Sequence, residues 1–180
     1  MVISFNQLHQ LIEQGVIDAL PENVNAASID IRIGDEIMIE DTVRTDQVVI
    51  DLDQKQAPNL KKIKVGEEGV VIPPGAFFLA TSIETFNLPD TISAEFKLRS
   101  SVARSGLQHM LAGWCDAGWH GSQLTMEFKN ELRNHSMLVK PGMRIGQMVF
   151  FEHESASEGS YAIKGRYNNQ VGVQESKGIS

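Results

Sequence analysis

The sequence predicts a mainly β fold, arranged as a sandwich or barrel, with one short helix at its start. Short alternating or apolar runs follow one another from residue 28 to residue 151, with no helical pattern between them, and such series are typical of these folds. Turn signals separate the runs, most clearly at residues 73–75, 88–90 and 140–142. With 180 residues, one domain over residues 1–180 is expected.

The N-terminal helix is predicted over residues 5–14. Apolar residues recur there at helical spacing, Ser4 precedes them and Gly15 follows, and these residue types favour helix starts and helix ends, respectively. Beyond the helix we expect strands over residues 28–33, 36–39, 47–52, 69–72, 77–82, 92–98, 124–128, 137–139 and 147–151.

Two segments lack a strong core pattern. Residues 41–64 are polar and charged, and residues 55–59 fit a surface loop. From about residue 164 onward the chain is rich in Gly, Asn, Gln and Ser, with almost no large apolar residues, so it cannot form a core face of its own. We expect a mobile C-terminal tail, although ordinary fraying of a terminus gives the same pattern.

Composition limits the possible partners and surroundings. A net charge of -7 disfavours a nucleic-acid polymer as the ligand, whereas a small anion needs only a local group of cations. No apolar run approaches the roughly 18 residues that span a membrane, and the N-terminus lacks the pattern of a secretory signal. The single cysteine, Cys115, excludes an intramolecular disulfide and fits a reducing compartment. A cytoplasmic protein without membrane contact is expected.

The cysteine count also bears on mechanism. Zinc-dependent nucleobase deaminases hold their metal through H-x-E and P-C-x-x-C motifs, and the sequence contains neither. Any deamination is therefore predicted to proceed without that zinc site.

Two arginines flank two serines at Arg99, Ser100, Ser101 and Arg104, directly after a predicted strand. Guanidinium groups pair bidentately with phosphate oxygens, and hydroxyl groups add further donors. The same pattern is more often a solvated helix start in which serine caps the amides.

Alternation over residues 124–128 places Leu124, Met126 and Phe128 on one face and leaves Thr125 and Glu127 on the other. This second face meets either solvent or a cleft. Burial in a cleft would tune a carboxylate toward proton transfer near neutral pH.

Asp116, followed by Ala and Gly, predicts a tight turn. The tryptophans on either side of it, Trp114 and Trp119, fit packing at a rim.

Together, the motifs resemble the signature of the dCTP deaminase family, within the dUTPase superfamily. They are Arg-Ser-Ser-x-x-Arg-x-Gly-Leu at 99–107, Ala-Gly-Trp-x-Asp-x-Gly-Trp-x-Gly at 112–121 and Thr-Met-Glu-Phe-x-Asn at 125–130. Pro-Gly-Met-Arg-Ile-Gly-Gln at 141–147 and Gly-Arg-Tyr-x-x-Gln-x-Gly at 165–172 continue them in order. With looser matches at 27–34 and 73–90, the resemblance covers nearly the whole chain except residues 41–64.

The resemblance implies a distorted jelly roll or β-barrel of the dUTPase-like (β-clip) type, assembled as a homotrimer with active sites between subunits. It implies hydrolytic deamination of dCTP to dUTP and ammonia without zinc, in pyrimidine deoxynucleotide biosynthesis. Mg²⁺ is expected to be bound by the triphosphate and by no protein side chain, and dTTP is expected as an inhibitor.

The resemblance also assigns roles to residues. Glu127 is expected to be the general base, Ser100 and Arg104 to position water and stabilise developing charge, and the backbone carbonyl of Ala112 to assist. Asp116 is expected to contact the deoxyribose. The expected triphosphate ligands are Arg99, Ser101, Tyr161, Arg166 and Gln170, with Gln147 facing the same region in no defined role.

Three residues depart from the common family pattern: Leu98 replaces Gly, Arg166 replaces Lys and Ala117 replaces a frequent Pro. Ala117 and the Gly113-Trp114 pair occur in a bifunctional dCTP deaminase/dUTPase, which forms dUMP and pyrophosphate and is the first alternative. A plain dUTPase and a non-catalytic nucleotide-binding or regulatory trimer are the others. A plain dUTPase fits less well because Glu127 and Arg104 follow the deaminase pattern. A binding trimer fits less well because it would need the phosphate ligands but no proton shuttle.

Overall fold

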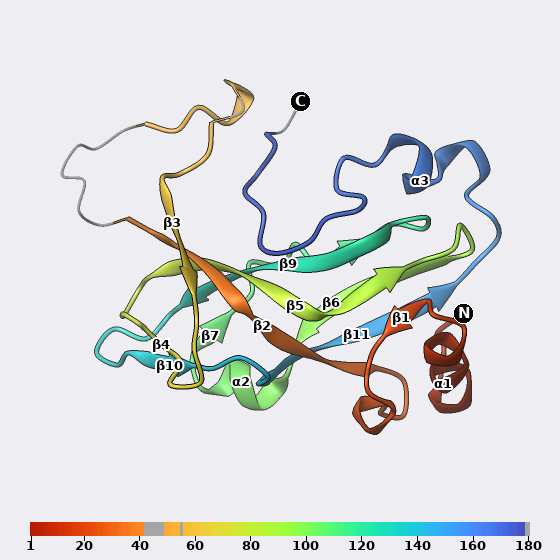
Figure 1. Cartoon of the computed structure of the whole chain (residues 1–180), viewed down its shortest axis with the longest axis horizontal. Helices are drawn as coiled ribbons and strands as arrows, with labels where there is room; N and C mark the ends of the chain where they lie inside the picture. Colours follow the sequence, from red (N-terminus) through yellow and green to blue (C-terminus); the bar gives the residue numbers. More distant parts are fainter. Residues whose placement is uncertain (42–48, 55, 179–180) are drawn as a thin grey trace.

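One curled antiparallel sheet forms the body of the molecule, as the computed structural model shows for residues 1–41, 49–54 and 56–178 (Figure 1). Within these residues the strands follow the order β7-β9-β5-β2-β11-β6-β8, with β1 added to β5 and β3 added to β2. A separate two-stranded sheet pairs β10 with β4. The strands are β1 (Ile17–Asp18), β2 (Ile29–Glu40), β3 (Leu60–Lys64), β4 (Val70–Ile72), β5 (Phe77–Asn87), β6 (Ile92–Leu98), β7 (Leu107–Gln108), β8 (Trp114–Cys115), β9 (His120–Asn130), β10 (Met137–Val139) and β11 (Arg144–Glu152). The prediction of a mainly β, barrel-like fold is confirmed.

The predicted N-terminal helix is present as α1 (Phe5–Glu13). Its first turn is closed by the Gln7 side chain, whose Oε1 accepts a hydrogen bond from the Ser4 amide at 3.4 Å. Gly15 follows the helix with a φ of 71°, a conformation that glycine adopts without strain. The other α-helices are the short α2 (Ser100–Arg104) and α3 (Tyr161–Lys164), and 3-10 turns occupy Pro21–Asn23, Leu52–Gln54 and Ser157–Gly159.

Most predicted strands are present, several of them longer than expected. The runs at 28–33 and 36–39 join into the single strand β2, which is irregular in its pairing with β5 between Ile33 and Ile37. Gly34 permits this irregularity, because a Cβ there would lie 2.6 Å from the Thr81 side chain. The two sequence runs were therefore one strand with a bulge between them.

The prediction of a strand over residues 47–52 is wrong for residues 49–52. Residues 47–48 lie outside the described residues, residues 49–51 form no strand, and a 3-10 turn begins at Leu52. Conversely, β3 was missed because its Leu-Lys-Lys-Ile-Lys sequence belongs to an edge strand with a solvated face.

The C-terminal tail, residues 165–178, runs back across β9 (Figure 1). The Gln123 amide donates to the Gln170 carbonyl at 2.8 Å, and Val173 is buried. Composition alone did not indicate this packing. No helix within the described ranges is long and apolar enough to span a bilayer.

Candidate functional site

A pocket of about 350 Å³ opens between the tail and the sheet, within the size range of small-molecule sites. Its walls come from strands β3, β5, β8 and β9, from the residues just before β3, from the turn after β8, from the start of α3, and from the tail. The lining residues are Ala57, Pro58, Leu60, Phe77, Leu79, Trp114, Cys115, Asp116, Trp119, Leu124, Thr125, Glu127, Tyr161, Tyr167, Gln170, Gln174, Glu175 and Ser176.

Glu127 lies on the pocket-facing side of β9. The alternation expected from the sequence is present: Leu124, Met126 and Phe128 are buried, whereas Thr125 and Glu127 are less buried and line the pocket, which Leu124 also borders. Burial raises the pKa of the Glu127 carboxyl above its usual value, opposed in part by a hydrogen bond from its own backbone. A carboxylate of raised pKa in a pocket can take up a proton near neutral pH.

Asp116 is held at the pocket mouth by the predicted tight turn, in which the Trp119 amide donates to the Asp116 carbonyl at 3.2 Å. The indole N–H of Trp114 donates to Asp116 Oδ1 at 2.9 Å, which fixes the direction of the carboxylate. The tryptophans differ in setting: Trp119 is buried and stacked on Phe86, whereas Trp114 is 56% exposed.

The tail side of the pocket carries Tyr161 and Gln170. The Tyr161 amide donates to the Ala117 carbonyl at 2.8 Å, and burial raises the pKa of the Tyr161 phenol. Gln170 is buried, and its Nε2 donates to Thr125 Oγ1 at 3.1 Å. The structure therefore brings together Asp116, Glu127, Tyr161 and Gln170.

The pocket is acidic. Among the described residues that line it, Asp116, Glu127 and Glu175 are acidic and none is Lys or Arg. A triphosphate needs cations or many directed N–H groups, so this wall alone suits the base and sugar of a nucleotide better than its phosphates.

The Arg-Ser cluster lies elsewhere in the same chain. Ser100, Ser101 and Arg104 are exposed on α2, which Figure 1 places below the sheet, whereas the tail lies above it. The cluster does start a helix, but the expected serine cap is absent, because the N-cap residue is Arg99 and makes no side-chain cap. Arg99 instead pairs with the buried Asp30 at 3.2 Å.

Three other predicted residues also lie outside the pocket lining. Ala112 is exposed in the loop before β8, and Gln147 lies on β11 opposite Lys97 of β6. Arg166 is exposed on the tail, with its guanidinium 5.9 Å from the Tyr167 ring centre. One chain thus brings Tyr161 and Gln170 together with Glu127, but not the other predicted phosphate ligands, Arg99, Ser101 and Arg166.

Sequence reasoning missed several pocket residues. Thr125 was placed on the face of Glu127 but given no role, although residues two apart on a strand share a face. Trp119 and Tyr167 belong to motifs that resemble the family but were given no role in the pocket, and Gln174 was not singled out. Folding of the tail brings Tyr167 and Gln174 to the sheet. Over the described part of the chain, no group of three or more His, Cys, Asp or Glu residues could hold a metal ion.

Comparison with known proteins places the chain in a class and then in a family. A solved structure of 2'-deoxycytidine 5'-triphosphate deaminase from Agrobacterium tumefaciens superposes with a TM-score of 0.64 at 19% identity, covering 83% of this chain and 47% of that one. The chain thus spans about half of that structure's length, and the likeness places the chain in the fold class of that deaminase. A family model described as dCTP deaminase-like matches residues 2–153, and the chain belongs to this family.

The names of two relatives bear on the product of the reaction. A protein of Persephonella marina named "dCTP deaminase, dUMP-forming" is 35% identical over 181 residues, covering 98% of this chain and 97% of its own. A Sulfurihydrogenibium protein of the same name is 36% identical over 182 residues, with the same coverage. These names disagree with dUTP as the expected product and agree with the bifunctional alternative.

Proposed function

We propose that the protein converts dCTP to dUMP in two hydrolytic steps. The first replaces the amino group of cytosine with oxygen and gives dUTP and ammonia. The second cleaves dUTP with water and gives dUMP and pyrophosphate. The observation that carries the first step is the pocket carboxylate Glu127, whose pKa is raised by burial. The names of the similar proteins support the second.

Glu127 acts as the proton shuttle of the deamination. It takes one proton from the attacking water and passes it to N3 of the base, then takes the remaining proton from the new C4 hydroxyl and passes it to the departing amine, so that C4=O forms as ammonia leaves. Attack of water at C4 forms the new C–O bond, and ammonia leaves from the tetrahedral intermediate. Asp116, whose carboxylate is directed by Trp114, binds the deoxyribose.

A neighbouring subunit supplies the cations. The pocket is acidic, and the arginines at residues 99 and 104 lie on another side of the same chain, so a second copy can present them to this pocket. This arrangement supports a homotrimer in which Ser100, Ser101 and Arg104 of one copy face Glu127 of the next. Mg²⁺ belongs to the substrate in this scheme, since phosphate oxygens bind it.

The chain functions as one domain, with the tail as a lid. Tail residues line the pocket directly, so movement of the tail would open or close it to bulk water, as in many enzymes.

An assay of products tests the proposal. Purified protein is incubated with Mg²⁺ and either dCTP or dUTP, while ammonia and pyrophosphate are measured. We expect one pyrophosphate for each ammonia released from dCTP. Ammonia without pyrophosphate would show a deaminase that stops at dUTP. Pyrophosphate from dUTP, with no product from dCTP, would show a dUTPase. No product from either nucleotide would show a binding protein.

Glu127→Gln tests the assigned base. Because the amide keeps the shape of the side chain but cannot accept the proton, ammonia release should fall by about 10²–10⁴-fold, with dCTP affinity largely retained in calorimetry. Glu131→Gln is the matched control, since Glu131 is exposed just past the end of β9 and pairs only with Lys129 among the described ion pairs. Substantial turnover by the Glu127 variant would remove this residue from its role.

Light scattering tests the assembly. A mass of three chains, near 60 kDa from a 19.9 kDa subunit, agrees with the trimer, and a monomer that deaminates dCTP contradicts it.

A further inference from the structure

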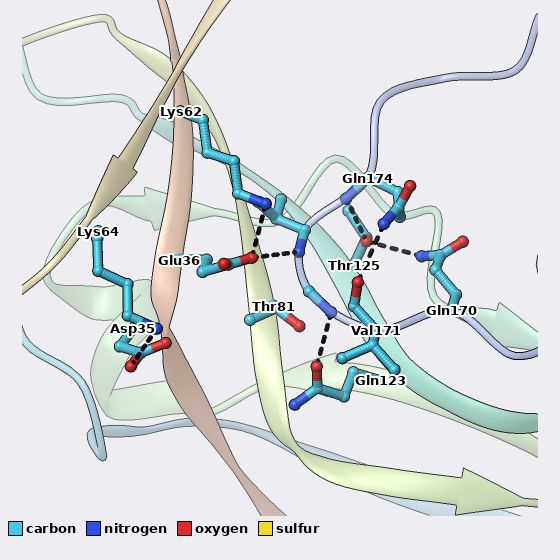
Figure 2. A network of polar contacts seen from close by, with 12 residues as sticks. Asp35, Glu36, Lys62, Lys64, Thr81, Gln123, Thr125, Gln170, Val171 and Gln174 are labelled. Carbon is cyan, nitrogen blue, oxygen red and sulfur yellow. Dashed lines mark hydrogen bonds and ion pairs between the residues drawn. The ribbon is translucent and has the colours of Figure 1, made fainter.

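Three consecutive amides of the tail are bound by side chains of the sheet (Figure 2). The Gly172 amide donates to Gln123 Oε1 at 2.8 Å, the Val173 amide to Glu36 Oε2 at 3.3 Å and the Gln174 amide to Thr125 Oγ1 at 3.2 Å. The acceptors come from two strands, β2 and β9, so the tail is fixed at one point from two directions.

The Glu36 acceptor is itself anchored. Lys62 of β3 lies 2.9 Å from Glu36 Oε2, and the Glu36 side chain is 24% exposed. The hydrogen bond from Lys62 holds the pKa of the Glu36 carboxyl below its usual value, against the opposing effect of burial. The carboxylate therefore remains charged at neutral pH, and hydrogen bonds to charged acceptors are stronger than neutral ones.

The tail backbone is shaped for this contact at Gly172. Its φ is 75°, and a Cβ at this position would lie 2.4 Å from Glu36 Oε2. Only glycine combines this conformation with so close an approach.

Thr125 connects the same contact to the pocket. Its Oγ1 accepts from the Gln174 amide and also from Gln170 Nε2. Gln170 is buried, lines the pocket, and its Oε1 has no hydrogen-bond partner in the described structure. Glu127 lies two residues further along β9, on the same face as Thr125.

We propose that Gln123, Glu36 and Thr125 form a tail clasp, a set of positioning residues that holds residues 172–174 and thereby sets Gln170 in the pocket beside Glu127. The inference deepens the proposed function, on which its kinetic consequence rests. The clasp acts on ligand binding through Gln170 and the tail wall, whereas proton transfer belongs to Glu127. Its loss should therefore raise KM more than it lowers kcat.

Glu36→Ala tests the clasp, with Asp35→Ala as the matched control. Asp35 pairs with Lys64 at 2.8 Å on the same two strands, and Figure 2 shows this pair apart from the tail contact. In Glu36→Ala, hydrogen exchange at the amides of residues 172–174 should become about tenfold faster or more, because a charged acceptor is lost. KM for dCTP should rise about tenfold with kcat within about twofold. Asp35→Ala should leave both quantities unchanged.

Thr125→Val gives a second, nearly isosteric test. It removes the acceptor of the Gln174 amide and of the Gln170 side chain, so it should likewise speed exchange at the tail and raise KM. Unchanged tail exchange in both variants, or equal effects of Glu36→Ala and Asp35→Ala, would overturn the clasp. Faster tail exchange with unchanged KM would overturn its link to the pocket.

The exchange measurement keeps this inference separate from the proposed reaction. If the unsubstituted protein releases no ammonia from dCTP, the proposed function fails, and tail exchange still decides whether the clasp holds the tail. If ammonia is released but neither variant alters tail exchange or KM, the function stands and the clasp is wrong.

Discussion

Removing Arg32 should destabilise the fold by leaving a buried charge unpaired. Arg32 Nε donates to Glu84 Oε1 at 2.8 Å, and the Glu84 side chain is fully buried. The backbone amide of Arg32 donates to the second oxygen, Oε2, at 2.9 Å. The pair joins strands β2 and β5 in the centre of the sheet.

The magnitude follows from these contacts. Breaking a buried ion pair by removing one partner costs about 3–5 kcal/mol. Arg32→Met removes the guanidinium but keeps the backbone amide on Oε2, so the lower end, about 3 kcal/mol, applies. For a chain of this length, that corresponds to a fall in Tm of about 6–12 °C.

Urea unfolding followed by circular dichroism, at one fixed protein concentration because an oligomer unfolds in a concentration-dependent way, measures this loss. Lys64→Met is the control: its pair with Asp35 is exposed, so removal should cost no more than about 1 kcal/mol. Adding Glu84→Gln to Arg32→Met should recover part of the loss. Equal costs for the Arg32 and Lys64 variants, or no recovery, would refute the reasoning.

Three further predictions concern the pocket. Only ionised Glu127 can accept a proton, and burial raises its pKa. As the pH is lowered, kcat/KM for ammonia release should therefore begin to fall at a higher pH than it would with an exposed glutamate as the base. A pH profile that stays flat down to the range of ordinary glutamates contradicts this. Trp114→Phe removes the N–H that directs Asp116 and should lower kcat/KM for dCTP about threefold to tenfold. If Asp116 binds the 3'-hydroxyl of the sugar, the effect should be smaller with 2',3'-dideoxy-CTP, which lacks that hydroxyl. Burial raises the pKa of the Cys115 thiol to about 12, so at pH 8 only about 10⁻⁴ of it is thiolate and iodoacetamide should label the folded protein far more slowly than the unfolded one; equal rates would show that the thiol is accessible.

Much of the fold followed from local pattern. Strands β6 and β10 match their predicted bounds, since the turn at 88–90 precedes β6 and the turn at 140–142 follows β10. Strand predictions failed where pairing with a strand distant in the sequence decides the structure. The lysines of β3 suit an edge strand only because β2 offers it a partner, and the join within β2 depends on how closely Gly34 approaches β5.

The candidate site was predictable in part for a similar reason. Period-two alternation placed Glu127 on the face opposite the core residues without deciding between solvent and a cleft, and local sequence predicted the turn at Asp116. The motif resemblance supplied the roles of both residues. The tail contributes Tyr167 and Gln174 through contacts with residues about fifty positions away, which no local pattern encodes. The motif resemblance supplied Gln170, but not the Thr125 hydroxyl that holds it.

The separation of acidic and basic groups within one chain has a genetic consequence. If each site combines Glu127 of one copy with Arg104 of another, two inactive variants can complement each other. Subunits carrying Glu127→Gln, co-assembled with subunits carrying Arg104→Ala, would form some sites whose two halves are both intact. Activity in the mixture would then rise well above that of either parent protein.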